Sequence, residues 1–103
     1  MKQMILAASM ALMGWTWMGA TGVEADAYLD EMTAACQVYG CSPDYLYSVM
    51  LCESGGDPGA VGPHGELGIF QIDPRYWGTM SDTEQIWFAA QHLTAGDIYW
   101  VCA

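Results

Sequence analysis

The fold is decided by the stretch Cys52-Glu53-Ser54-Gly55-Gly56-Asp57-Pro58, which places a single glutamate where a helix should end. Upstream, Ser42-Pro43-Asp44 combines an N-cap residue, a proline suited to the first helical position and an acid in the first turn. We therefore expect a helix over residues 43–53. The two glycines can then take up the left-handed conformation that ends a helix, because they lack a Cβ atom.

Glu53 shares one stripe of this predicted helix with apolar side chains. It follows at helical spacing after Leu46, Val49 and Met50. An apolar wall and the unpaired carbonyls of a helix C-terminus both disfavour a carboxylate, so we expect a raised pKa for Glu53. A raised pKa suits a general acid near neutral pH. Glu53 is therefore a candidate proton donor, and the alternative is a solvated glutamate at a helix end.

A second stretch, Ala60-Val61-Gly62-Pro63-His64-Gly65-Glu66-Leu67-Gly68-Ile69-Phe70-Gln71-Ile72, is a turn-rich loop entering a short apolar segment. Gln71 is the only strongly polar side chain in that segment, and an amide there can orient a polar ligand. At these residues the chain resembles the lysozyme-like lytic transglycosylases, whose pattern is roughly E-S-x-G-x-P-x-A-V-x-x-x-G-x-x-G-x-x-Q-I. The matching residues run from Glu53 to Val61 and continue with Gly65, Gly68, Gln71 and Ile72.

The resemblance implies a mainly α, small lysozyme-like (α+β) domain with a short turn-rich cleft region. It also implies that Glu53 is the catalytic acid/base and that Ser54 and Gln71 lie near the glycan. The family cleaves the β-1,4 bond between N-acetylmuramic acid and N-acetylglucosamine in peptidoglycan, usually through attack by the muramyl 6-hydroxyl, which gives a 1,6-anhydro product. This chemistry requires no metal or cofactor.

One departure from the family keeps a second class of function open. The A-Y-N-x-G segment that usually completes the far wall of the cleft has no match in this chain. A glycan-binding module with weak turnover is therefore the alternative to an enzyme. The intact Glu53 favours the enzyme, because a pure binder has no need for an acid in an apolar site.

Three further acids lie close to Glu53 in the sequence, and most glycosidases use two carboxylates. Asp57 follows two glycines and Asp73 precedes a proline, so we interpret both as turn or cap residues. Glu66 lies where the family more often has a small residue, and we expect it to touch substrate or water. If Glu66 positioned a water molecule, the enzyme would be a muramidase that hydrolyses like a lysozyme.

Aromatic side chains are candidates for a sugar platform, because a flat ring packs against the apolar face of a pyranose. Tyr76 and Trp77 follow the Arg75 turn, and Tyr99 and Trp100 lie near the C-terminus. Packing in the core is the alternative for each tryptophan. The predicted substrate-binding set comprises Ser54, Glu66, Phe70, Gln71, Tyr76 and Trp77.

The first residues of the chain have a different character from the rest. Lys2 supplies a positive start, an apolar run extends over residues 4–20, and small residues near residues 23–27 suit cleavage. We interpret residues 1–27 as a secretory signal peptide, with an uncleaved membrane anchor as the alternative. Either interpretation makes residues 28–103 a single exported domain, periplasmic, secreted or associated with the cell wall.

This domain is short for a self-sufficient core and is expected to need covalent staples. Beyond the signal segment the chain has an even number of cysteines, namely Cys36, Cys41, Cys52 and Cys102. An even number in an exported chain favours two disulfides, for which three pairings are possible. We favour Cys36 with Cys41 and Cys52 with Cys102. A metal site is the competing use, and the absence of a C-x-x-C pair argues against it. The chain has a cysteine directly before Glu53 and a Trp-x-Cys sequence near its C-terminus. In this arrangement it resembles the compact domain of the resuscitation-promoting factors, which act on peptidoglycan.

Local signals predict the remaining elements. Ser81-Asp82-Thr83-Glu84 is a capping box that opens a helix over residues 82–95, and another helix is expected over residues 28–39. A short helix is expected within residues 69–72 or 75–78. A hairpin within residues 59–67 is compatible with the sequence but is not required, because the glycines there fit turns better than strands.

The charge balance limits the partners. The chain has 2 Lys and Arg against 12 Asp and Glu, giving a net charge of −10. Nucleic acid is excluded as a partner, because no cationic surface can neutralise phosphates. Peptidoglycan glycan strands would be recognised through the cleft, or after delivery by a secretion, conjugation or phage assembly, rather than through diffuse electrostatic attraction.

Overall fold

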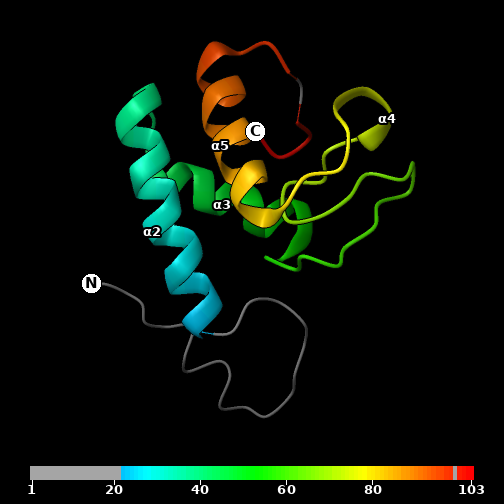
Figure 1. The fold of residues 1–103 in the computed structure, drawn as a ribbon, viewed down its shortest axis with the longest axis horizontal. Helices are drawn as coiled ribbons and strands as arrows, with labels where there is room; N and C mark the ends of the chain where they lie inside the picture. The colour runs from blue at the N-terminus through cyan, green and yellow to red at the C-terminus, as the bar shows by residue number, and fades with distance from the viewer. Residues whose placement is uncertain (1–21, 99) are drawn as a thin grey trace.

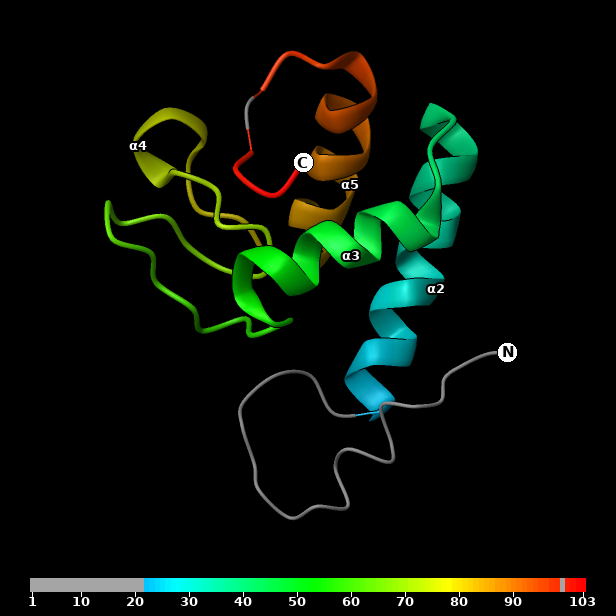
Figure 2. The same ribbon diagram turned by 180° about the vertical axis from the view of Figure 1, so that it is seen from behind.

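The computed structural model describes residues 22–98 and 100–103. Within that range the helices are α2 (Gly22–Tyr39), α3 (Pro43–Ser54), α4 (Pro74–Trp77) and α5 (Asp82–Ala95). Figure 1 shows α2 on one side of the molecule and the loop that carries α4 on the other, with α3 and α5 between them. The reverse view in Figure 2 shows the same order, and α2 packs against both α3 and α5.

The helix that carries Glu53 begins and ends as its sequence predicts. The Ser42 side chain accepts a hydrogen bond from the Tyr45 N–H at 3.2 Å, and Pro43 occupies the first turn. Gly55 adopts the left-handed conformation with φ 70° and donates its N–H to the Leu51 carbonyl at 2.8 Å. The expected apolar stripe is confirmed, because the buried residues of α3 are Leu46, Val49 and Met50.

Helix α5 matches its predicted span of residues 82–95. Ser81 and Glu84 form the reciprocal capping box, and Gly96 ends the helix at φ 71°. Helix α2, in contrast, begins at Gly22 rather than at residue 28, so it crosses the expected boundary of the signal segment. Cleavage near that boundary stays a prediction, and residues 1–21 lie outside the described part of the chain. Among the described helices, none has the length and apolar character needed to cross a membrane.

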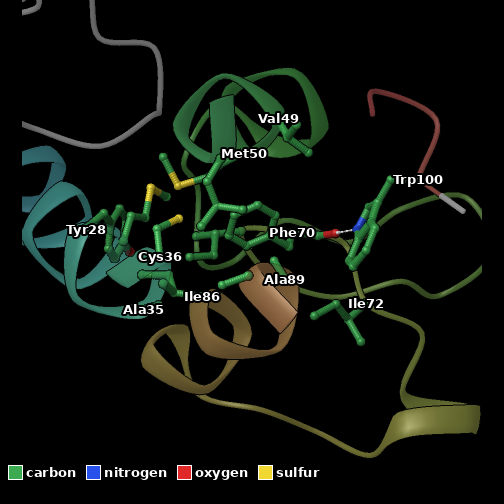
Figure 3. Close-up of a cluster of buried hydrophobic side chains, with 14 residues drawn as sticks. Tyr28, Ala35, Cys36, Val49, Met50, Phe70, Ile72, Ile86, Ala89 and Trp100 are labelled. Carbon is green, nitrogen blue, oxygen red and sulfur yellow. Dashed lines mark hydrogen bonds between the residues drawn. The ribbon is translucent and has the colours of Figure 1, made fainter. Parts of the chain in front are cut away.

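Phe70 lies in the middle of the hydrophobic core, between α3 and α5 (Figure 3). Its side chain is completely buried, so our expectation that Phe70 binds substrate is wrong. The backbone around it is held by Gln85 of α5, the one buried polar residue within the described range. The Gln85 side chain accepts a hydrogen bond from the Phe70 N–H at 2.8 Å and donates one to the Leu67 carbonyl at 2.9 Å. The core therefore fixes the course of the loop between α3 and α4.

That loop is built from turns rather than strands. Isolated antiparallel bridges pair Val61 with Leu67 and Leu67 with Ile72, and residues 59–67 form no longer hairpin. Residues 69–71 form a turn and Ile72 pairs in a bridge, so there is no helix within residues 69–72, whereas the second expected position of a short helix is occupied by α4. Asp73 caps α4 by accepting the Arg75 N–H at 2.9 Å, which confirms it as a cap residue.

Both expected disulfides are present, and their pairing is confirmed. Cys36–Cys41 joins the end of α2 to the approach to α3. Cys52–Cys102 joins the last turn of α3 to the C-terminal tail, by which we mean residues 97–98 and 100–103. The tail is thereby fixed beside the end of the helix that carries Glu53.

Candidate active site

Glu53 opens into a cleft of about 500 Å³ between the end of α3, the loop before α4 and the C-terminal tail. Three sets of residues line it. The helix end contributes Cys52 and Glu53. The loop and the first residues beyond it contribute Pro63, His64, Glu66, Gln71, Ile72, Asp73 and Trp77. The remaining wall is formed by α5 and the tail, through Phe88, Ile98, Trp100, Val101 and Cys102.

The environment of Glu53 favours its protonated form. Burial raises the pKa of Glu53 above its ordinary value, and the negative charge of Glu66 raises it further. A hydrogen bond that the Cys102 N–H donates to Glu53 Oε2 at 3.2 Å acts in the opposite direction. The expected direction of the pKa shift is confirmed.

Glu66 lies in the same cleft but in the opposite electrostatic situation. Its own backbone N–H and that of His64 hydrogen-bond the carboxylate and lower its pKa, and the His64 ring adds to this effect. The His64 N–H lies 2.9 Å from Glu66 Oε1. The cleft therefore contains one carboxyl group biased towards the acid form and one biased towards the carboxylate.

Gln71 is held in a conformation that is rare for a residue with a side chain. Its φ is 53°, in the left-handed region. The side-chain Nε2 donates to the carbonyls of Ala60 at 3.2 Å and Gly68 at 3.0 Å. Oε1 of the same amide lies beside Gly62, where an added Cβ atom would overlap both Gln71 Oε1 and Glu66 Oε1. Gly62 thus lets two acceptor oxygens converge at the cleft.

Of the other predicted binding residues Ser54, Tyr76 and Trp77, only Trp77 lines the cleft. Ser54 does not line the cleft, since its hydroxyl donates to the Ile69 carbonyl at 2.8 Å and accepts the Gly56 N–H at 3.0 Å. Tyr76 is 74% exposed and lies outside the cleft lining. Trp77 does line the cleft, and its ring packs edge-on against Phe88 at 5.0 Å between centroids.

The C-terminal tail is the part of the site that the sequence analysis largely missed. Trp100, a candidate sugar platform with core packing as its alternative, is 6% exposed and donates its ring N–H to the Phe70 carbonyl at 2.8 Å, which agrees with the core alternative. Tyr99, the neighbouring candidate, lies outside the described residues. The even cysteine count was the signal for this wall, since the bond between Cys52 and Cys102 brings the tail to Glu53.

Asp57 and His92 have structural roles in the described chain. Asp57 accepts the Gly59 N–H at 2.8 Å in a turn, as expected. His92 packs against Trp77 and Phe88 and contacts Asp97 at 2.7 Å. Over residues 22–98 and 100–103, no group of three or more His, Cys, Asp or Glu side chains is arranged to hold a metal ion.

Comparison with known protein families gave one match that bears on this site. The model of the transglycosylase SLT domain matches residues 30–87, which is more than half of the chain. The matched region contains Glu53, Glu66 and Gln71 but not the C-terminal tail. A comparison with curated proteins found no match.

Proposed function

Because the chain belongs to the transglycosylase SLT domain family, we propose that it is a lytic transglycosylase that cleaves the β-1,4 bond between N-acetylmuramic acid and N-acetylglucosamine in peptidoglycan. The family implies a peptidoglycan-directed enzyme of the glycosidase or lytic transglycosylase type. The observation that supports a catalytic role is the position of Glu53, a half-buried acid with a raised pKa in a cleft of this chain. We propose Glu53 as the catalytic acid/base.

In the proposed reaction Glu53 begins as the neutral acid. It gives its proton to the glycosidic oxygen as the bond from that oxygen to the muramyl C1 breaks. The resulting carboxylate then takes the proton of the muramyl 6-hydroxyl, whose oxygen bonds to C1 and closes the 1,6-anhydro ring. One carboxyl group serves both steps, and the proton it loses first is restored by the second. The route needs no metal or cofactor.

The side chains around Glu53 suggest how a sugar would be held. The exposed part of the Trp77 ring offers an apolar face, and Gln71 Oε1 offers an acceptor for a hydroxyl or amide group of the glycan. Tyr76 would contribute only to a strand that extends beyond the cleft. Ser54 would act by fixing the end of α3 against Ile69 rather than by touching the glycan.

Location and partners follow from the same proposal. Two disulfides are consistent with an exported protein, and peptidoglycan lies outside the cytoplasm. We propose that residues 1–27 act as a signal peptide or membrane anchor and that residues 28–103 are the working domain. Delivery by a secretion, conjugation or phage assembly would bring so anionic a domain to the wall.

The experiment is digestion of purified peptidoglycan by the oxidised protein, with mass spectrometry of the soluble products. Anhydro-muropeptides should appear with the wild type and be lost in Glu53→Gln, by about 100-fold or more, because the amide cannot supply the proton. Asp30→Asn, which removes an exposed acid of α2, is the matched control and should retain activity. Full activity in Glu53→Gln would overturn the mechanism. Glycan binding without products would instead favour the binding module.

A further inference from the structure

Two acceptor oxygens meet beside Gly62, on the loop wall of the cleft that contains Glu53. They are Oε1 of Glu66 and Oε1 of Gln71, and each lies so close to the position of an added Cβ at residue 62 that it would overlap that atom. Glu66 Oε1 also accepts the His64 N–H at 2.9 Å. Such a pair suits a small O–H donor that can bond both oxygens at once, and a water molecule has two O–H groups for this purpose.

The Glu66 carboxylate is held in place, which a water-positioning group requires. Its Oε1 accepts the His64 N–H at 2.9 Å, and its Oε2 lies 3.5 Å from His64 Nδ1. The Glu66 carbonyl accepts the Gly62 N–H at 2.8 Å, so the backbone on both sides of the turn is also fixed. The side chain is 26% exposed, which leaves it accessible from the cleft.

The other acids of the region are committed elsewhere. Both carboxylate oxygens of Asp73 bond Arg75, with contacts as short as 2.7 Å, and one of them also caps α4. Asp57 bonds the Gly59 N–H in its turn and does not line the cleft. Glu66 is therefore the acid that lines the cleft together with Glu53 and is not bonded to Arg75.

We propose that Glu66, together with Gln71 Oε1, positions and deprotonates a water molecule, so that the enzyme has a hydrolytic branch beside the anhydro-forming one. This inference rests on the proposed function of Glu53. The water oxygen bonds to the muramyl C1 as the glycosidic C1–O bond breaks. Glu53 gives its proton to the leaving oxygen, and Glu66 takes a proton from the water. Solvent returns that proton from Glu66 to Glu53, and the product is a reducing muramyl end.

The test is product analysis in water enriched in ¹⁸O, with peptidoglycan whose existing reducing ends have first been reduced by borohydride. After that treatment only the hydrolytic branch creates a reducing muramyl end with solvent oxygen on C1. In Glu66→Gln the amount of labelled reducing ends should fall by about tenfold or more. The readout is the ratio of labelled reducing ends to anhydro ends, because the loss of the Glu66 charge also removes one cause of the raised pKa of Glu53 and can lower both products. Asp30→Asn, with the same loss of one negative charge at an exposed site, should leave both products unchanged.

A second variant makes the test independent of the folding of Glu66→Gln. Gly62→Ala places a methyl group against both acceptor oxygens and should also lower the labelled fraction, although Glu66 itself is intact. An unchanged ratio of the two products in both folded variants, or no labelled ends from the wild type, would overturn the proposal. If Glu53→Gln stays active, the proposed function itself fails. If Glu53→Gln is inactive but the ratio of hydrolytic to anhydro products is unchanged in Glu66→Gln and Gly62→Ala, this inference alone fails.

Discussion

The two disulfides should contribute very different amounts to stability, because they close rings of very different length. Cys36–Cys41 joins residues 5 apart in sequence, and Cys52–Cys102 joins residues 50 apart. Loop-closure entropy in the unfolded chain then gives about 2 kcal/mol for the short ring and about 4 kcal/mol for the long one. Replacing each pair by alanines should therefore lower the free energy of unfolding by amounts that differ by about 2 kcal/mol.

The assay is equilibrium urea unfolding followed by tryptophan fluorescence and circular dichroism. With a slope of about 1 kcal/mol per molar urea for a small domain, the midpoint of the long-ring variant should lie about 2 M below that of the short-ring variant. A constant concentration of sucrose keeps the weaker variant folded at the start of the titration. Reduced wild type, with both bonds open, should match the variant that lacks all four cysteines. Equal midpoints, or a larger loss for the short ring, would refute the entropic reasoning.

The remaining predictions concern Glu53 and Gln85. Turnover should fall as pH rises through the pKa of Glu53, which lies above its ordinary value of 4.5, and a pH–rate profile that stays flat across that range would contradict the acid role. Between the ordinary and the raised pKa the folded state binds more protons than the unfolded state, so the wild type should lose stability relative to Glu53→Gln as pH rises through that window. Gln85→Leu leaves the Phe70 N–H without a partner and removes one of the two hydrogen bonds to the Leu67 carbonyl, which keeps the Ile72 N–H, and it should lower the free energy of unfolding by about 2–4 kcal/mol. The control Gln91→Leu, at an exposed site on the same helix, should change it by about 0.5 kcal/mol or less, and equal losses in the two variants would exclude this role for Gln85.

The helix boundaries could be predicted because their signals are local. Ser42 and Ser81 cap helices through contacts within one turn, and Gly55 and Gly96 end them through their own φ angles. The start of α2 was harder to place. Its upstream residues resemble a processing site, and that interpretation concealed their capacity to continue a helix to Gly22.

The site was only partly predictable, because much of it depends on contacts between distant residues. No periodicity in a four-residue apolar segment shows which side chain turns inward, so Phe70 could not be assigned to the core from sequence. The hydrogen bond from the Cys102 N–H to Glu53 joins residues that are 49 apart in the sequence. Gln85 gave no signal at all, since a glutamine within a helix is usually exposed.

The Cys52–Cys102 bond also determines how the cleft would survive damage to the chain. Every residue that lines the cleft belongs to the span from Cys52 to Cys102, so the whole cleft lies on one closed covalent circuit. A protease that cuts one peptide bond in an exposed turn of that circuit, for instance near Gly65, turns the circuit into a linear chain but separates no part from the rest. The core around Phe70 would still hold the two new ends in register. The same turn is therefore a natural place for new termini in a circularly permuted form of the protein.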